Sequence, residues 1–486
     1  MLFNSYIFVL LFLPSCLAGY FALNHFRFER GASYFLLGMS LWFYAYFNIK
    51  YLPIILFSIC FNFFFHRLLC HTRRFSVRKT ALCAAVLFNL GLLFYFKYYD
   101  FFFSNVNLAF GSSFVLKHLV LPLGISFFTF QQISLVIDTY WGETAEYGFL
   151  DYALFVSYFP QLIAGPIVTH QELIPQFQDP EKRKLNWDNF SRGLYLFALG
   201  MGKKVILADT FGNAVNWGFN NIGSLDTING GLIMLSYTFQ IYFDFSGYCD
   251  MASGIAKMMN IDLPLNFKSP YRAFTITEFW ERWHITLTRF FTRYVYIPLG
   301  GSRGSALRTY RNIILVFLVS GLWHGANWTF VIWGGLHGVF VVITRHFHQF
   351  FEKLHPALNW LLTFVFVNIT WIFFRANSIR QALLFGYQMA LLNFSSIKDQ
   401  ILNCFALPEL RLILEALHIN FGNFYNRFCL LIFFLAALWL AVGGKNAVER
   451  TDGFRPSLSR SAVTVFLLTW CIFSFSGISA FLYFNF

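Results

Sequence analysis

The chain has 486 residues, of which 57% are apolar and only 12% are charged. An average soluble domain is about 45–50% apolar and about 25% charged, so both a polar globular fold and intrinsic disorder are excluded. The net charge is +13, yet a mean hydropathy of +0.55 leaves little polar surface for nucleic-acid binding. Basic cytoplasmic loops between apolar spans explain both values. The composition therefore indicates a polytopic membrane protein.

The N-terminal segment and the cysteines give two further expectations. The first apolar stretch is not preceded by the basic n-region of a secretory signal peptide, so we expect it to remain as a transmembrane helix. The eight cysteines include no CxxC or Cys/His spacing of a metal site, and several lie inside apolar runs. We therefore expect no bound metal and no disulfide framework.

Apolar segments of membrane-spanning length recur along the whole chain. A span takes about 20 residues, and we expect roughly 11–13 membrane segments. Residues 67–79 hold five basic side chains and no acidic one, which indicates the cytoplasmic side and puts the N-terminus outside. The expected segments lie near residues 3–23, 32–48, 51–66, 80–97, 118–137, 150–168, 190–208, 229–247, 312–343, 357–375, 380–394, 426–443 and 461–484.

Two regions differ from plain spans. Residues 160–189 are polar and rich in proline, which predicts a substantial loop, partly in the membrane plane. Residues 277–296 predict an amphipathic helix that lies flat at the membrane, with a helix at the mouth of an internal cavity as the alternative. Five polar residues at helical spacing form one face of it: Glu278, Arg282, Thr286, Arg289 and Arg293.

The segment 312–343 contains the most informative polar group. Its 32 residues are too long for one straight crossing, and several glycines offer places to bend or break. His324 lies in its middle, and an ionisable side chain at membrane depth marks a functional site by default. A desolvated, neutral imidazole can act as a general base. Gly321 and Gly325 would leave backbone open to an approaching substrate. The structural alternative is a histidine that only hydrogen-bonds a neighbouring helix.

Other polar residues carry weaker signals. His284 follows Glu281 by three residues, and alone it would be an ordinary interfacial histidine. His337 is expected to pack or to support the site. The pair Lys203 and Lys204 and the turn at residues 300–304 are interpreted as orientation signals, although that turn could also accept a phosphate through its amides.

Several motifs follow one another in the middle of the chain. Among them are Phe159-Pro-Gln-Leu-Ile-Ala-Gly165 and Phe243-Asp244-Phe-Ser-Gly-Tyr-Cys-Asp250, and the most specific are Phe279-Trp-Glu-Arg-Trp-His284, Tyr296-Ile-Pro-Leu-Gly-Gly301 and Gly321-Leu-Trp-His324-Gly-Ala-Asn-Trp328. With these motifs the chain resembles the membrane-bound O-acyltransferases, and within them the branch of the alginate O-acetylation protein AlgI, with the peptidoglycan O-acetylation protein PatA and the D-alanylation protein DltB as relatives. The match runs from about residue 120 to residue 345, with small departures at Glu281, Thr292 and Ser302.

The resemblance implies a fold and a pair of catalytic residues. His324 matches the family's essential histidine and His284 the supporting one. The implied fold is an all-α polytopic membrane protein, a ring of helices around a tunnel with re-entrant and interfacial helices. We expect one such domain over residues 1–486, with N-terminal helices in 1–118, the motif-bearing core in 119–345 and C-terminal helices in 346–486.

The implied reaction is acyl transfer from a cytoplasmic thioester, acetyl-CoA or another, without a bound cofactor. His324 would be the general base, and His284, Asn327, Trp323 or Trp328 would stabilise the oxyanion, with Glu281 nearby. Candidates for the tunnel lining and the donor phosphates complete the predicted site. They are Asp138, Asp244, Asp250, Gly165 and Asn266 for the tunnel, and Arg282, Arg289, Arg293 and Arg303 for the phosphates.

The expected partners follow from this reading. The acceptor would be an extracytoplasmic polysaccharide such as alginate, peptidoglycan or cellulose, reached through a separate extracytoplasmic SGNH-type acetyltransferase. The expected location is the bacterial inner membrane, with membrane lipid as a partner and no nucleic acid. Two alternatives remain: a transporter in which His324 relays protons, and a non-catalytic scaffold of an envelope polysaccharide assembly.

Overall fold

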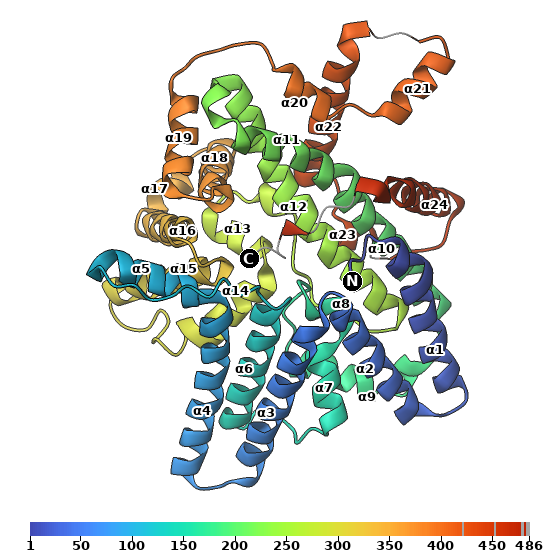
Figure 1. The fold of residues 1–486 in the computed structure, drawn as a ribbon, viewed down its shortest axis with the longest axis vertical. Coiled ribbons are helices and arrows are strands. Elements are labelled where there is room, and N and C mark those ends of the chain that lie inside the picture. Colours follow the sequence, from blue (N-terminus) through green and yellow to red (C-terminus); the bar gives the residue numbers. More distant parts are fainter. Residues whose placement is uncertain (420–421, 452, 478–480, 483–486) are drawn as a thin grey trace. The chain divides into compact units, whose positions relative to one another are not determined.

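The computed structural model describes residues 1–419, 422–451, 453–477 and 481–482 (Figure 1). Over these residues the regular structure is helical, and an isolated antiparallel bridge joins Phe267 to Trp283. The predicted all-α class is confirmed. The chain forms two compact units built from separate stretches. Unit 1 comprises Met1–Gly200, Tyr248–Leu265 and Thr451–Phe486, and unit 2 comprises Met201–Gly247 and Asn266–Arg450. The division at residues 118 and 345 stays a prediction.

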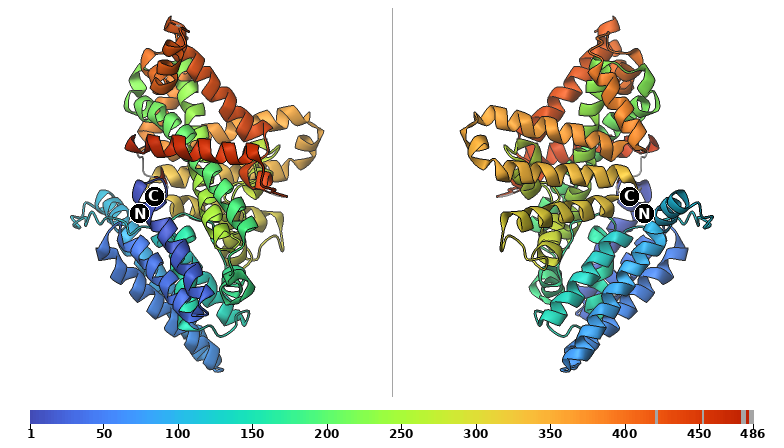
Figure 2. Two further views of the ribbon diagram at one scale, coloured as in Figure 1. Left: turned by 90° about the vertical axis from the view of Figure 1, so that its right-hand side faces the viewer. Right: turned by 90° about the vertical axis from the view of Figure 1, so that its left-hand side faces the viewer.

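Unit 1 is built mainly from the N-terminal helices. α1 to α4, blue in Figures 1 and 2, run side by side, and α6 packs on α3 and α4. Asn62 of α3 and Asn89 of α4 exchange amide hydrogen bonds of 3.2 and 2.6 Å, so two buried polar side chains satisfy each other. The helices are α1 (Leu13–His25), α2 (Glu29–Ala45), α3 (Leu52–His71), α4 (Phe75–Leu93), α5 (Tyr99–Phe110), α6 (Ile125–Trp141), α7 (Phe149–Ser157), α8 (Phe159–Leu162), α9 (His170–Gln178), most of α10 (Trp187–Gly202) and α24 (Leu458–Phe473).

Unit 2 contains the segments with the two candidate histidines. The long helix α12 (Thr227–Met258) belongs to this unit as far as Gly247. The other helices are α11 (Asp209–Asn220), α13 (Ile276–Arg282), α14 (Ile285–Phe291), α15 (Ala306–His324), α16 (Trp328–His346), α17 (His348–Lys353), α18 (Pro356–Arg375), α19 (Ile379–Ala390), α20 (Asp399–Cys404), α21 (Pro408–Ala416), α22 (Tyr425–Leu438) and α23 (Ala447–Thr451), whose last residue falls in unit 1.

Six helical stretches of the described residues are long and apolar enough to cross a membrane. The prediction of a multi-pass membrane protein is therefore confirmed. The count of 11–13 segments and the ring around a tunnel stay predictions. The six stretches are Phe8–His25, Ile49–His71, Phe75–Phe110, Trp328–His346, Pro356–Arg375 and Tyr425–Gly443.

The predicted segment 312–343 is a helical hairpin. α15 ends at His324 and α16 begins at Trp328, and the two helices pack tightly along their length. A Cβ at Gly321 would lie 2.3 Å from the carbonyl oxygen of Phe330, and one at Gly334 would lie 2.3 Å from that of Phe317. These glycines therefore allow close helix contact. The idea that Gly321 and Gly325 keep backbone open to a substrate is wrong, because α16 and the Phe330 ring cover them.

Two other predicted segments differ from the structure. Residues 111–122 are not helical, so the helix expected at 118–137 begins only at Ile125. The loop expected at 160–189 contains α9, which begins with a capping box between Thr169 and Glu172. Local capping thus forms a helix where proline content alone predicted a loop.

Candidate active site

The turn between α15 and α16 places His324 at the end of a helix. Gly325 follows it with an extended backbone, at a φ of −166°, so α15 stops there. Asn327 then caps α16, since its side-chain oxygen accepts the backbone N–H of Thr329 at 3.0 Å. His324 is only 2% exposed. Local backbone chemistry therefore ends the helix and holds the imidazole in the protein interior.

Aromatic rings surround His324. The centroid of its ring lies 4.9 Å from that of Trp323, 5.1 Å from Trp333 and 5.2 Å from Phe374. All three contacts are edge-to-face, an arrangement that aromatic pairs prefer. The rings come from α15, α16 and α18. Packing of three helices therefore fixes the position of this histidine in an apolar environment.

His284 lies at a break in the predicted amphipathic helix. α13 ends at Arg282 and α14 begins at Ile285, and His284 between them has a φ of +46°, in the left-handed region. The single helix predicted over 277–296 is therefore wrong. The backbone N–H of Ile285 donates to the carbonyl of Asn266 at 3.0 Å, which holds the break against the preceding segment. His284 is fully buried and is not an interfacial side chain.

Asn266 fixes the ring of His284. Its Oδ1 accepts the backbone N–H of Thr286 at 3.3 Å and the hydroxyl of Thr286 at 2.9 Å, which identifies this atom as the acceptor oxygen. His284 Nδ1 lies 3.1 Å from the same oxygen, so Nδ1 carries the proton and Nε2 presents a lone pair. Burial lowers the pKa of His284 to about 3, which keeps its ring neutral at physiological pH.

The two histidines lie close together. Their ring centroids are 6.4 Å apart, and Trp323 packs on both rings, 5.9 Å from His284 and 4.9 Å from His324. Phe245 of α12 covers another side of His284 at 4.9 Å. The structure therefore brings together two residues that are forty positions apart in the chain. At this separation both rings can contact one small substrate group.

The residues predicted to surround the histidines take different places. The Asn327 amide donates to the carbonyl of Asn377 at 3.0 Å while its oxygen caps α16, so the whole side chain serves the turn. Trp328 is 50% exposed, and Glu281 is exposed on α13. Among the predicted neighbours, Trp323 is the one that packs on both histidine rings.

The residues predicted to line the tunnel belong to both units. Asn266 contacts His284, as described. Asp138, Gly165 and Asp250 belong to unit 1, where Asp138 lies 3.2 Å from His170. Gly165 has a local reason to be glycine, because a Cβ would lie 2.4 Å from the Cα of Gln161.

Asp244 belongs to a buried ion-pair cluster that sequence reasoning missed. Lys204 Nζ lies 2.6 Å from Asp244 and 2.8 Å from Asp209, and Lys204 is 1% exposed. The interpretation of Lys204 as a plain orientation signal is therefore wrong. Asp244 precedes Phe245, which packs on His284. The ion pair thus anchors the part of α12 that supports the second histidine. The available sequence signal was Asp209, five positions after Lys204, in an apolar chain.

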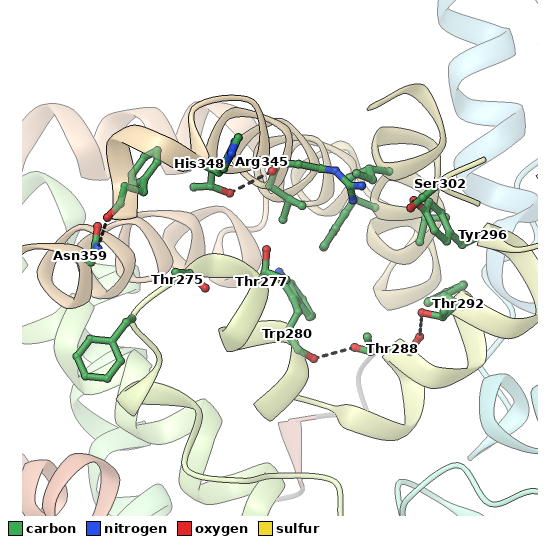
Figure 3. A pocket seen from close by; sticks show the side chains of 18 of the residues that line it. Thr275, Thr277, Trp280, Thr288, Thr292, Tyr296, Ser302, Arg345, His348 and Asn359 are labelled. Carbon is green, nitrogen blue, oxygen red and sulfur yellow. Dashed lines mark hydrogen bonds between the residues drawn. The ribbon is translucent and has the colours of Figure 1, made fainter. Parts of the chain in front are cut away.

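A cavity of about 920 Å³ lies between the α13–α14 segment and the α15–α16 hairpin (Figure 3). Trp280 of α13 and Ser320 of α15, one turn before His324, form part of its wall. Arg345, His348 and Glu352 line another part, where α16 and α17 meet. The alternative that this segment lines a cavity thus agrees with the structure.

The arginines predicted to bind donor phosphates are absent from the lining of this cavity. Arg282 pairs with Glu278 on α13, at 2.7 Å. Arg289 and Arg303 are exposed, and the guanidinium of Arg293 lies 5.6 Å from the ring centroid of Tyr294. Arg345, in the last turn of α16, was not predicted, and its position at the end of an apolar span was the available signal.

Fold and site together define a polytopic membrane protein with a buried histidine pair and, in the same unit, a cavity lined by neighbouring residues such as Thr288 and Ser320. The family model of the membrane-bound O-acyltransferases matches residues 143–383. A peptidoglycan O-acetyltransferase of Helicobacter pylori is 46% identical over 413 residues, which cover 79% of this chain and 78% of the relative. A probable alginate O-acetylase AlgI of Pseudomonas aeruginosa is 40% identical, with 79% of this chain and 73% of the relative covered. A teichoic acid D-alanyltransferase of Bacillus subtilis is 28% identical over 256 residues, covering 50% of this chain and 63% of the relative.

These similarities place the chain in a family. The chain belongs to the membrane-bound O-acyltransferase family and is an O-acyltransferase. The resemblance expected from the motifs is therefore confirmed.

Proposed function

We propose that this protein moves an acetyl group from a cytoplasmic thioester across the membrane for O-acetylation of an extracytoplasmic polysaccharide. The observation that carries the proposal is the buried pair of His324 and His284, with ring centroids 6.4 Å apart. The relatives named as peptidoglycan and alginate acetylating enzymes support the acetyl group and the glycan. Because identity is higher to the peptidoglycan O-acetyltransferase, peptidoglycan is the first acceptor to test.

In the proposed reaction His324 is the general base. It takes the proton of the acceptor hydroxyl while that oxygen forms a bond to the thioester carbonyl carbon. The tetrahedral intermediate collapses, the carbon–sulfur bond breaks, and the leaving thiolate receives the proton back from His324. The products are an ester and a free thiol. The aromatic surroundings of His324 exclude water, which would otherwise hydrolyse the thioester.

The geometry changes the role proposed for His284. A neutral ring with the proton on Nδ1 offers an acceptor at Nε2, not a donor. We therefore assign His284 to hold the acceptor hydroxyl through its lone pair, and not to stabilise the oxyanion. The Trp323 indole, which packs on both histidines, is the candidate oxyanion donor.

The cavity is the proposed donor site. The hydroxyl of Tyr310 on α15 lies 3.2 Å from His346 on α16, which shows that the basic ends of the two antiparallel helices meet. The positive-inside rule places this end in the cytoplasm. Arg345 and His348 could then contact the phosphates of acetyl-CoA, while the wall formed by Trp280 and Ser320 lies toward His324.

Two expectations about the protein's surroundings belong to this proposal. The transferred group would pass to a separate extracytoplasmic acetyltransferase of the SGNH type, which modifies the glycan. The membrane would be the inner membrane of a bacterium, since acetyl-CoA is cytoplasmic and the glycan is outside. The organisms of the relatives support a bacterial setting.

The test is replacement of the proposed base. His324→Ala, expressed at the level of the wild type, should remove ester-linked acetate from the cell-envelope glycan, measured after mild alkaline release. His25→Ala is the matched control, because His25 is an exposed histidine of α1 with no part in the proposed site. Unchanged acetate in His324→Ala would contradict the catalytic proposal and favour a scaffold.

The donor site has its own test. Arg345→Ala should raise the KM for acetyl-CoA in inverted membrane vesicles and leave kcat nearly unchanged, because the side chain binds the donor away from the reacting atoms. Lys353→Ala is the control, since Lys353 lies nearby on α17 but does not line the cavity. An unchanged KM in Arg345→Ala would remove the cavity from the proposal.

A further inference from the structure

His337 connects the cavity wall with the surroundings of His324. It is fully buried on α16, between Trp280 and Thr370. The indole N–H of Trp280 donates to His337 Nδ1 at 3.3 Å, and His337 Nε2 lies 3.0 Å from the hydroxyl of Thr370. Three elements, α13, α16 and α18, are thus joined through one imidazole.

The direction of these hydrogen bonds follows from the partners. The Thr370 hydroxyl donates its proton to the carbonyl of Val367 at 2.9 Å, so it can only accept from His337. The proton of His337 is therefore on Nε2, and Nδ1 accepts from the donor-only indole of Trp280. The hydrogen bonds run in one direction, from the Trp280 indole through His337 and the Thr370 hydroxyl to the Val367 carbonyl. Such a series of hydrogen bonds holds its side chains rigidly.

Two tryptophans, Trp280 and Trp333, contact His337. Trp280 lines the cavity, and its ring lies 5.7 Å from that of Trp333. Trp333 packs on His337 at 4.9 Å and on His324 at 5.1 Å. Within the described structure the Trp333 indole N–H has no hydrogen-bond partner, so packing alone holds this ring. Movement of His337 would therefore shift both tryptophans.

We propose that His337 is a positioning residue for acyl transfer, which orients Trp280 at the end of the donor cavity and, through Trp333, the ring of His324. This inference rests on the proposed function. His337 itself contacts no substrate in this scheme. Its effect is on the alignment of the thioester with the base, to which reaction rates are sensitive at the scale of an ångström.

Paired variants separate its two hydrogen bonds. Asn can accept near the position of Nδ1, so His337→Asn retains the acceptor for Trp280, whereas His337→Leu removes both bonds. We expect His337→Asn to keep kcat within threefold of wild type and His337→Leu to lower it at least tenfold. The measurement is transfer of radiolabelled acetate from acetyl-CoA in inverted membrane vesicles, normalised to folded protein. His25→Leu, at an exposed histidine of α1 in unit 1, should leave kcat unchanged.

A double-variant cycle tests the link to Trp280. Trp280→Phe keeps a ring but removes the N–H, so it should lower kcat as His337→Leu does. The double variant should then be no slower than the worse single variant, because both remove the same interaction. Multiplying losses would contradict the proposal. A lower thermal midpoint in His337→Leu, with unchanged kcat per folded protein, would also overturn it, since that result describes a purely structural residue.

The variant His324→Ala distinguishes a failure of the proposed function from a failure of the role proposed for His337. If His324→Ala retains acetylation, the proposed function fails. If His324→Ala is inactive but His337→Leu has wild-type kcat, only the role of His337 is refuted.

Discussion

At the scale of single residues, Asn266 determines what His284 can do. The amide oxygen binds Nδ1 and also receives two hydrogen bonds from Thr286, so it has no freedom to rotate. The left-handed backbone of His284 is held by the same segment. A strained conformation that is retained by several neighbours is typical of functional sites.

Replacing Asn266 should therefore lower the acetylation activity more than the stability of the fold. Asn266→Ala leaves the Nδ1 proton without its acceptor, so the ring is free to change tautomer and orientation. We expect acetylation to fall at least tenfold while the protein remains folded. Asn368→Ala is the control, because Asn368 is another buried asparagine of unit 2, bonded to Thr238. Equal losses of acetylation in the two variants would contradict this role of Asn266, because removing any buried asparagine would then have the same effect.

The low pKa of His284 predicts a stability that depends on pH. The folded value is about 3 and the ordinary value is 6.5. Between them the unfolded chain binds a proton that the folded chain does not, so stability is complete above pH 6.5 and declines as the pH falls. At pH 5 the cost is about 2 kcal/mol. The thermal midpoint of the wild type should thus fall more between pH 7.5 and pH 5 than that of His284→Gln. Identical falls would contradict this assignment.

At the scale of elements, the α15–α16 hairpin depends on two glycines that face the partner backbone. Gly321 meets Phe330 and Gly334 meets Phe317 at distances where no Cβ fits. The neighbouring Gly335 differs, since its nearest side-chain atom, of Leu318, would be 3.5 Å from an added Cβ. The backbone of α15 therefore approaches α16 closely only on the face of α16 that contains Gly334.

A matched pair of alanine variants tests this packing. Gly334→Ala should destabilise the protein by about 1–3 kcal/mol, because the helices must separate. Gly335→Ala should be neutral or slightly stabilising, since alanine is the better helix former. Thermal midpoints in detergent, together with acetylation, measure both effects. Because His324 ends α15, Gly334→Ala should also lower activity. A larger loss of stability in Gly335→Ala would contradict this account of the hairpin.

At the scale of the whole molecule, we expect basic residues to orient the chain in the membrane. The turn between α3 and α4 contains Arg73 and Arg74. The turn before α3 lies at the other end of that helix. The positive-inside rule puts the first turn in the cytoplasm and the second outside. The arrangement of α1 to α4 as adjacent helices is compatible with this alternation.

Cysteine labelling can measure the orientation. In a variant lacking the eight native cysteines, Phe47→Cys should react with a membrane-impermeant maleimide on intact spheroplasts. Arg73→Cys should react only after permeabilisation. Both positions are exposed, so a lack of reaction reports sidedness rather than burial. The reverse labelling pattern would contradict the orientation predicted for α3 and α4.

The candidate site was predictable in part. His324 stood out because a lone ionisable residue in an apolar segment is costly, and the family motif strengthened its assignment. The burial of His284 was not predictable, because periodicity continued across a position whose left-handed backbone ends the helix. Arg345, His337 and Lys204 were underestimated for a common reason. Their importance depends on what lies beside them, and one-dimensional patterns report only neighbours in the chain.

The sequence alone was enough to determine the membrane class, the family and the approximate place of the six long apolar helices. These properties follow from apolar run length, charge asymmetry and contiguous motifs, all of which are local in the chain. Only the tertiary structure decided that Asn266 orients His284, eighteen residues away, and that Trp280 binds His337, fifty-seven residues away. Those pairings form when helices pack. Many register choices satisfy the same hydrophobic pattern, but only the packed arrangement brings these polar side chains within hydrogen-bond distance of one another.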